Sequence, residues 1–464
     1  MSKFKPGPMP PVRPALLSHP VTVPANPVPT ASRALQASLP PVRVNGIQRF
    51  GFAMLCVYAI APLLNDFFAL QFRLSPRLTL IPTAAVFFCT AFSGHLGRAL
   101  KVPLGRWWLA LIVLMIAATP FSFWPGGSTA MLQDYVPRRY VLLFCICALQ
   151  VTLGQQIRFA YVNILSTALI LFLCLRYGTV SDSDGRFFIL ESLFFDNSND
   201  LAIGLLCAAT SVLFVFFARG FLLKIIAGSE IVLCLFYILK TGSRGTFIAV
   251  LVAAMVAMMF AKKRLLLMLL VPALLIGLIA IAPSQTLKRL VSIVADPEAQ
   301  VAAGTAGGDV ESQLQRQDLL KMSLKLTITH PILGVGPGMF DNFVQQRAKQ
   351  AGTHIASLNT HNSYTQISSE CGIPALICYV ATLVLTIKIN YRIYRALVKK
   401  QGQVDGRITG IAFSGFIGCI AFVVAGFFHH IAYGGYQPLL AGEAIALWLA
   451  TRPILESPRP SPRG

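Results

Sequence analysis

Charged residues are scarce in this chain, and acidic residues are the rarest of them. Only 12% of the 464 residues are Asp, Glu, Lys or Arg, and 18 acidic residues stand against 39 basic ones. Soluble domains carry about 25% charged residues, so this composition argues against an ordinary soluble enzyme. The hydrophobic residues, 55% of the total, form long apolar runs along most of the chain. These runs predict an all-α integral membrane protein with many spanning helices.

The chain also lacks the short motifs of several enzyme classes. It contains no P-loop, no H-E-x-x-H motif and no G-x-S-x-G elbow. Cysteine is absent between Ala282 and Glu370, and almost all of the ten cysteines, such as Cys145 and Cys174, lie inside apolar runs. We interpret them as small buried hydrophobic residues rather than as disulfides or metal ligands. The sequence therefore predicts no cofactor and no metal site.

The domain organisation follows from proline and from the apolar segments. Residues 1–46 contain 11 of the 29 prolines and lack the apolar core of a signal peptide, which predicts a disordered cytoplasmic tail whose regulatory or partner-binding role stays open. Residues 47–283 are expected to hold nine spanning helices, residues 369–452 three more, and residues 453–464 a second cytoplasmic tail. The predicted spans are approximately 48–65, 78–94, 105–124, 139–155, 157–176, 200–218, 221–239, 244–261, 265–283, 369–389, 408–428 and 434–451.

The distribution of charge orients these predicted spans. With the N-terminus in the cytoplasm, 24 of the 39 Lys and Arg residues fall in or beside inner segments, and 14 of the 18 Asp and Glu residues fall in or beside outer ones. This asymmetry agrees with the positive-inside rule, and it explains the net charge of +21 without a nucleic-acid partner. Both termini are therefore expected to face the cytoplasm, and residues 284–368 to form one large outer loop that contains short helices.

The second half of this outer loop is predicted to begin with a helix near Glu311. An apolar stripe at a spacing of four residues runs along this helix through Leu320, Leu324 and Ile328. Arg316 continues the stripe one turn earlier, so we interpret it as more than a generic surface cation. The helix is expected to end at His330-Pro331, before a compact glycine-rich turn around Gly336.

Polar residues are dense in segment 361–375, where the chain is predicted to re-enter the membrane. Asn359 or Thr360 is expected to cap this helix, which would place His361 in the first turn. The positive end of the helix would keep the imidazole neutral and attract phosphate. The alternative is a histidine that merely accompanies a helix cap. Glu370 lies half a turn out of phase with His361, so it is expected to support the bundle or to contact another helix.

Four further outer stretches carry polar residues of interest. Arg244 opens a helix after a tight turn and could bind phosphate through its guanidinium or simply extend toward the interface. Asn199 or Asp200 is expected to cap the helix that follows it. The segment 182–184 has the D-x-D form of some metal sites, but three residues in a polar loop are weak evidence. The pair His429-His430 lies at an outer edge, where a shared metal ion is not expected.

Taken in order, these motifs resemble the O-antigen ligase/polymerase superfamily of bacterial membrane glycosyltransferases. The resemblance covers roughly residues 190–380. The superfamily pattern around the histidine matches at His361, Asn362, Glu370 and Gly372, and departs at Thr365 and Ala375. Further matches are Arg316 followed by His330-Pro331 and Gly334-Val335-Gly336, the turn Ser243-Arg244-Gly245, and Asn197, Asn199, Asp200, Leu201 and Ala202.

The resemblance implies transfer of a glycan from undecaprenyl pyrophosphate at the periplasmic face of the bacterial inner membrane, without a metal ion. It also implies roles for individual residues: His361 in catalysis, Arg244, Arg316 and Asn362 in binding pyrophosphate or substrate, and Glu370, Asn199 and Gly336 in support. The implied partners are the lipid-linked glycan, membrane lipid, and an acceptor that is lipid A-core or a growing polysaccharide. Ligation to lipid A-core is slightly favoured over polymerisation of repeat units. A glycan transporter or flippase is the alternative of another class.

Overall fold

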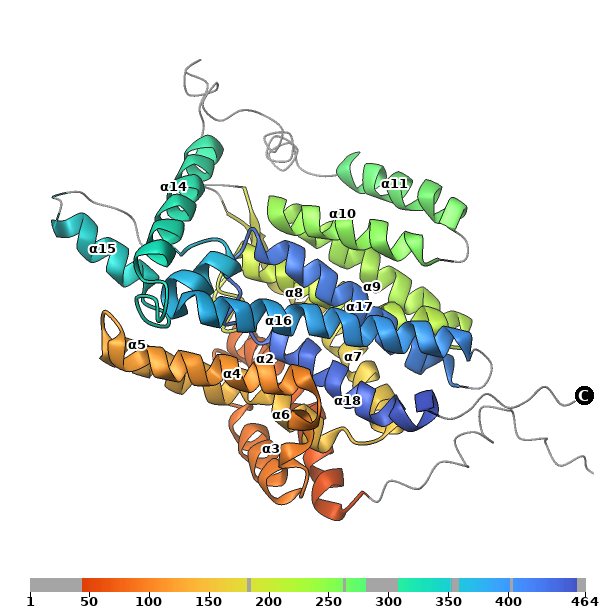
Figure 1. Ribbon diagram of the computed structural model, residues 1–464. Coiled ribbons are helices and arrows are strands. Elements are labelled where there is room, and N and C mark those ends of the chain that lie inside the picture. The colour runs from red at the N-terminus through yellow and green to blue at the C-terminus, as the bar shows by residue number, and fades with distance from the viewer. Residues whose placement is uncertain are drawn as a thin grey trace, which may run out of the picture.

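The computed structural model describes residues 44–181, 185–261, 264–280, 308–350, 352, 359–400 and 404–456. Most of these residues are helical (Figure 1). The longer helices are α2 (Gly46–Phe72), α4 (Pro103–Ala118), α7 (Leu153–Tyr177), α8 (Ser198–Ser211), α9 (Phe221–Lys240), α10 (Arg244–Met259), α11 (Arg264–Ala280), α14 (Gly308–Thr329), α16 (Ser363–Lys399), α17 (Gly406–Gly426) and α18 (Tyr436–Glu456). The shorter elements are α3 (Leu80–Phe92), η1 (Leu96–Lys101), η2 (Thr119–Phe121), α5 (Pro125–Tyr135), η3 (Val136–Tyr140), α6 (Leu142–Leu149), η4 (Val212–Phe217) and α15 (Phe340–Gln350).

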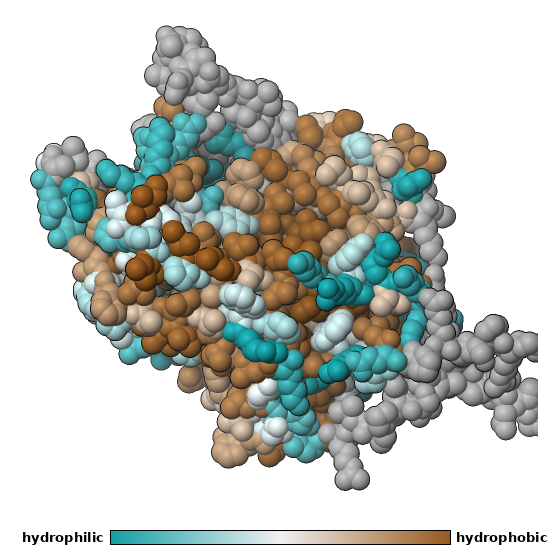
Figure 2. All heavy atoms as spheres, viewed as in Figure 1, coloured by the Kyte–Doolittle hydropathy of each residue, from teal (hydrophilic) through white to brown (hydrophobic). Residues whose placement is uncertain are grey.

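Eight helical segments of the described chain are long and apolar enough to cross a membrane, and three shorter apolar helices accompany them. Together with α6, these segments coincide with the twelve predicted apolar runs. The chain is thus an all-α membrane protein, and the number of crossings stays a prediction. Apolar side chains cover the middle of the face in Figure 2, with hydrophilic ones toward its two ends.

The predicted span 139–155 is wrong in its boundaries. Helix α5 already begins at Pro125, a π-helical turn (η3) follows, and α6 ends at Leu149. Helix α6 ends there because Thr152 caps the next helix, α7. The Thr152 hydroxyl accepts a hydrogen bond from the Gln155 backbone N–H, and the Gln155 side chain accepts one from the Thr152 N–H. This capping box satisfies amide groups that a continued helix would not need to cap.

Helix α16 is central in the bundle and packs against α17, α4, α18 and α14. It is kinked at Gly372, where φ is +85° and a Cβ would lie 2.1 Å from the carbonyl oxygen of Ile332. Only glycine fits a left-handed position with so close a backbone approach. The kink directs residues 363–371 toward α14, which lies across one end of the bundle (Figure 1).

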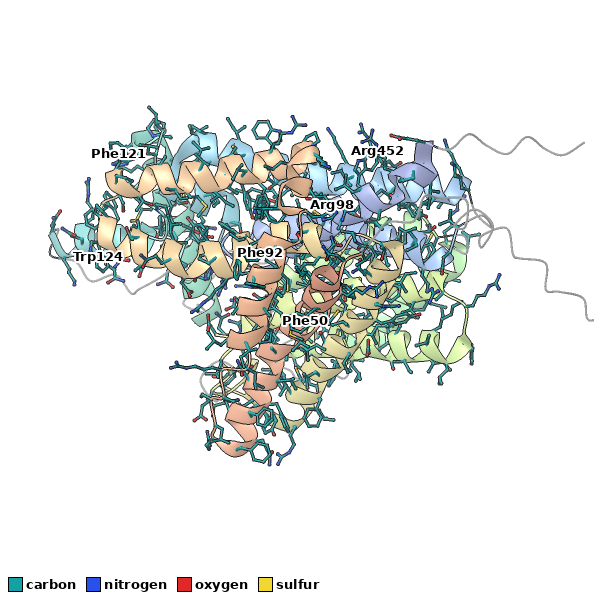
Figure 3. All side chains as sticks on the ribbon, turned by 90° about the horizontal axis from the view of Figure 1, so that it is seen from below. Phe50, Phe92, Arg98, Phe121, Trp124 and Arg452 are labelled. Carbon is teal, nitrogen blue, oxygen red and sulfur yellow. The ribbon has the colours of Figure 1, made fainter. Side chains whose placement is uncertain are left out.

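This end of the bundle, which we call the α14 end, also contains the aromatic residues that follow α4. Phe121 and Trp124 lie there, and Arg452 lies toward the opposite end (Figure 3). Phe121 is 72% exposed and Trp124 53% exposed. A backbone hydrogen bond of 2.8 Å from Phe123 N–H to the Val335 carbonyl ties this segment to the turn after α14.

A short β-hairpin follows helix α7. Strands β1 (Gly178–Val180) and β2 (Phe187–Ile189) pair antiparallel, with Gly178 opposite Ile189. Phe187 and Ile189 are buried against the helices. The hairpin therefore fixes Arg186, the residue directly before β2, relative to the bundle.

Candidate functional site at the α14 end

His361 lies directly before helix α16, in a left-handed conformation with φ of +50°. The cap of α16 is Asn362, whose side-chain oxygen accepts hydrogen bonds from the backbone N–H groups of Tyr364 (2.9 Å) and Thr365 (3.1 Å). The expectation that Asn359 or Thr360 caps the helix is therefore wrong. The Asn362 side chain already satisfies two of the free amides at the helix start, so His361 stands outside the first turn.

The start of α16 is fastened to the loop between α17 and α18. The Asn362 side-chain amide donates to the carbonyl of Phe427 at 3.1 Å. The Ser363 hydroxyl donates to the carbonyl of His429 at 2.6 Å and accepts from the N–H of Ile431 at 2.9 Å. These bonds bring His429 and His430 beside His361. Asn362 holds this arrangement with both the oxygen and the nitrogen of its side-chain amide, and its contact with substrate stays a prediction.

The imidazole rings of His361 and His430 meet edge to face, with centroids 5.4 Å apart and an interplanar angle of 80°. The Nδ1 atoms of both rings are buried, and neither has a hydrogen-bond partner in the described part of the chain. Burial lowers the pKa of His361 to about 3, with further lowering by Arg316, His430 and Arg186. Burial and Arg316 likewise lower the pKa of His430 to about 4, against the opposing charge of Asp196. Both rings are neutral at pH 7, chiefly through burial rather than through the helix end.

The neighbouring His429 contacts the start of helix α10. Its Nε2 atom lies 3.1 Å from the Thr246 hydroxyl and 3.5 Å from the Ser243 hydroxyl. A Cβ at Gly245 would lie 2.2 Å from the Cβ of Phe428, so only glycine allows this approach. The turn that carries Arg244 is thus packed against the histidine loop, and the half-buried Arg244 opens α10 at that point.

Arg316 reaches the same region from helix α14, close enough to lower the pKa of His361, His429 and His430. The apolar stripe predicted to continue from Arg316 is wrong, because Leu324 is 46% exposed and Ile328 is 78% exposed. A spacing of four residues drifts by about 40° at each step around a helix of about 100° per residue. The buried face follows Leu319, Ser323 and Leu326 instead.

Glu370 connects α16 to the turn after α14. Its carboxylate accepts hydrogen bonds from the backbone N–H groups of Gly338 (2.8 Å) and Phe340 (3.3 Å) and from the Tyr433 hydroxyl. The hydroxyl groups of Thr327 and Ser368 form a second link between the two helices at 2.7 Å. These contacts fix the C-terminal half of α14 and, through the rigid helix, the direction from which Arg316 approaches.

Gly336 has a structural reason for being glycine. Its φ is +110°, and a Cβ there would lie 1.9 Å from the hydroxyl oxygen of Ser122. Its N–H donates to the carbonyl of Glu370 at 2.9 Å. The turn after α14 can therefore lie flat against both α16 and the segment before α5 only because this position has no side chain.

Arg186 is a residue of the site that the sequence did not single out. Its Nε donates to the Thr241 carbonyl at 2.9 Å and its Nη2 to the Asn199 side-chain oxygen at 2.6 Å. Its charge helps to lower the pKa of His361 and His429. In sequence, one arginine in a polar loop resembles a solvated residue. The only signal was its position in the short outer segment before the N-x-N-D-L-A motif.

Asn199 thus orients Arg186 and does not cap its helix. The cap of α8 is Asn197, whose side-chain oxygen accepts from the N–H groups of Asn199 (2.9 Å) and Asp200 (3.1 Å). The expectation that Asn199 or Asp200 caps this helix is wrong, because Asn197 precedes both and satisfies their amides first.

The chain contains one segment that is similar to a known protein family. Residues 230–380 match the family model described as O-antigen ligase. This part of the chain belongs to the O-antigen ligase/polymerase superfamily. No curated protein matches the chain. Members of the superfamily are membrane glycosyltransferase-type enzymes. The match and the apolar helices together indicate a bacterial inner-membrane protein.

The superfamily match contains some of the site and not the rest. Arg244, Arg316, His361 and Glu370 lie within residues 230–380, whereas Arg186, His429 and His430 lie outside them. The structure therefore adds residues from both flanks of the matched region to the site.

Metal-ligating groups do not gather among the described residues: no three or more His, Cys, Asp or Glu side chains there are arranged to hold a metal ion. The D-x-D segment at 182–184 lies outside the described residues. What the described site offers is positive charge from arginines beside neutral imidazoles. Such a site suits an anionic group next to a hydroxyl that gives up its proton.

Proposed function

We propose that this member of the O-antigen ligase/polymerase superfamily transfers a glycan from undecaprenyl pyrophosphate to an acceptor hydroxyl, with ligation of O-antigen to lipid A-core as the favoured reaction. One observation supports the proposal most: Arg316 and His361, which lie on separate helical segments, approach closely enough for the arginine charge to act on the imidazole. The α14 end, where they meet, is formed by segments whose charge pattern predicts the periplasmic side. We infer that the site faces the periplasm and that both termini face the cytoplasm.

The proposed chemistry separates the roles of the arginines and the histidine. As the acceptor oxygen bonds to the anomeric carbon, the bond from that carbon to the phosphate oxygen breaks, and the pyrophosphate leaves with the bonding electrons. Arg316 and Arg244 would stabilise the negative charge that grows on the leaving group. His361 would accept the proton of the acceptor hydroxyl or orient that hydroxyl. In this proposal the arginines supply the positive charge, and the reaction is metal-independent.

The low pKa of His361 fits such a role once the donor is bound. A free imidazole with a pKa of about 3 is a weak base. Arg316 and Arg186 contribute to that low pKa, and an anionic pyrophosphate would neutralise their effect. Donor binding is therefore expected to raise the pKa of His361 and to make it a better proton acceptor only when the reaction can proceed.

Deleting the gene in its own bacterium and separating the surface lipopolysaccharide on a gel would test the proposed acceptor. Loss of all O-chain, with accumulation of lipid-linked polymer, is the result expected of a ligase. A single repeat unit on the core would show a polymerase instead. Unchanged lipopolysaccharide would exclude lipid A-core as the acceptor.

Complementation with variants would then test the site. His361→Ala should restore protein in the membrane but no transfer, a loss of about 10²- to 10⁴-fold for a missing proton acceptor. His95→Ala is a matched control, because His95 contacts Gln48 and Ser93, remote from the proposed site. Near-normal transfer by His361→Ala would remove His361 from the reaction.

A further inference from the structure

The two buried imidazole nitrogens at the α14 end are unusual features of this fold. Buried polar atoms are nearly always hydrogen-bonded, so each exception calls for an explanation. Here two such atoms, Nδ1 of His361 and Nδ1 of His430, belong to rings in direct contact. The proposed function uses only the first. The second lies outside the part of the chain that matches the superfamily.

The backbone on both sides of His430 is fixed by hydrogen bonds. Ser363 bonds to the carbonyl of His429 and to the N–H of Ile431, the residues that flank it. The ring of His429 bonds to Thr246 at the start of α10. These bonds fix the backbone on both sides of His430, and its ring packs edge to face against that of His361. A ring placed in this way, with an unpartnered nitrogen, has the preorganisation expected of a ligand-binding group.

We propose that His430 is a second substrate-binding histidine and that it holds the acceptor hydroxyl together with His361. This inference rests on the proposed function and names the group that the two rings recognise: a sugar hydroxyl of the acceptor. A neutral imidazole offers one N–H donor and one nitrogen acceptor. A hydroxyl matches two such rings, because it donates its proton to one ring and accepts a hydrogen bond from the other.

The division of labour between the rings follows from the direction of the reaction. The hydroxyl proton points to His361, which takes it as the new glycosidic bond forms. His430 donates its N–H to one lone pair of the same oxygen, which leaves the other lone pair directed at the anomeric carbon. With the unprotonated nitrogen of His361 facing the substrate, a phosphate oxygen could not take the place of the hydroxyl, since it has no proton to donate. We therefore place the anionic group beside Arg316 and the hydroxyl at the two unpartnered Nδ1 atoms.

Amide substitutions can test which nitrogen of His430 matters. Asparagine places a hydrogen-bonding group near the position of Nδ1, whereas glutamine places one near Nε2. We expect His430→Ala and His430→Gln to lower the transfer rate at limiting acceptor by about 10- to 100-fold, the effect of one lost hydrogen bond to a buried partner. His430→Asn should recover much of this loss. Binding of the lipid-linked donor should stay within about twofold of the unmodified protein in all three variants.

The experiment uses the full-length protein in nanodiscs, with a purified undecaprenyl-pyrophosphate glycan as donor and lipid A-core as acceptor. Donor retention is measured without acceptor, and initial rates are measured against acceptor concentration. His95→Ala serves as the histidine control. Full activity of His430→Ala would overturn the inference, and so would equal rates for His430→Asn and His430→Gln. Loss of donor binding in His430→Asn would show that the ring only supports the fold, which also overturns it.

The proposed function fails in a different way. Unmodified protein that binds the donor but never transfers its glycan would overturn the proposed reaction and, with it, the acceptor role of His430. Normal transfer by the unmodified protein and by every His430 variant would overturn the role of His430 alone.

Discussion

The carboxylate of Glu370 accepts a hydrogen bond of 2.8 Å from the backbone N–H of Gly338. This bond joins the first part of α16, just after His361, to the turn that ends α14, the helix of Arg316. The two groups proposed to act in the reaction are thus positioned by one buried side chain. The geometry of the site depends on this link as much as on the reacting groups.

Replacing Glu370 by alanine should therefore destabilise the protein and reduce transfer. The change leaves Phe340 N–H, Gly338 N–H and the Tyr433 hydroxyl without their acceptor, at a cost of about 1–3 kcal/mol for each buried group left unsatisfied. Thermal unfolding in detergent would measure the loss. Glu370→Gln keeps one acceptor oxygen, so its melting temperature should lie between those of the unmodified protein and Glu370→Ala. A Glu370→Ala protein as stable as the original would contradict the proposed link.

Replacing Arg316 by lysine should cost most of the transfer activity. Lysine keeps the positive charge but loses the planar fork that binds two phosphate oxygens at once. We expect a decrease of about 100-fold or more, the size seen when one preorganised donor to a developing charge is removed. Rates in membranes containing labelled donor would measure it.

Lys321→Arg is the matched control for this change, because Lys321 lies on the same helix in an exposed pair with Asp318. It should transfer at the normal rate. Retention of full transfer by Arg316→Lys would show that bidentate binding at this position is not needed.

Stability should fall as the pH drops from about 6.5 toward 4. The pKa values of His361 and His430 are lowered to about 3 and about 4 in the folded protein. A histidine in the unfolded chain has a pKa of about 6.5. Above the unfolded pKa both states are neutral, and the two histidines add no pH dependence. Below it the unfolded state binds protons that the folded state does not, so unfolding becomes easier as the pH decreases.

Melting temperatures across this range, compared with those of a His361→Asn/His430→Asn double variant, would measure this effect. The charged or titratable groups that act on the two rings are Arg316, Arg186, Asp196 and His429, and none of them changes in the variant. The double variant should show a flatter profile between pH 4 and 6.5. Identical slopes would mean that the two histidines titrate normally in the folded protein.

Replacing Gly336 by alanine should disturb the turn after α14. Its φ of +110° is unfavourable for any side chain, at about 1–3 kcal/mol, and the new Cβ would collide with the Ser122 hydroxyl. We expect a lower melting temperature and weaker transfer. Gly228→Ala is the control, because it lies in helix α9 with open space around it and should be neutral or slightly stabilising. Equal melting temperatures for the two variants would contradict this account of the turn.

Local patterns in the sequence predicted the elements of this protein well. Apolar runs located the helices, since a run of that length can be buried only by a membrane or a neighbouring helix. The chemistry of individual side chains singled out Arg316 and His361. Both inferences need only residues that are near one another along the chain.

Local patterns were less successful at the ends of helices. The caps at Asn197 and Asn362 each displaced a neighbouring candidate, because several polar residues compete for the same free amides and only the final backbone path decides among them. The apolar stripe on α14 was wrong for a similar reason. Its buried face depends on where α16 lies, and a spacing of four residues fits more than one face.

The sequence by itself determined that this is an all-α membrane protein and which segments between the apolar runs carry unusual polar residues. Only the tertiary structure decided that Arg186 and His430 join His361 and Arg316 at one end of the bundle. Two contacts between segments far apart in the chain bring these residues together. Ser363, at the start of α16, bonds to the carbonyl of His429, and Asn199, at the start of α8, accepts a hydrogen bond from Arg186. No periodicity within a single element encodes such contacts, since they arise from the packing of one helix against another.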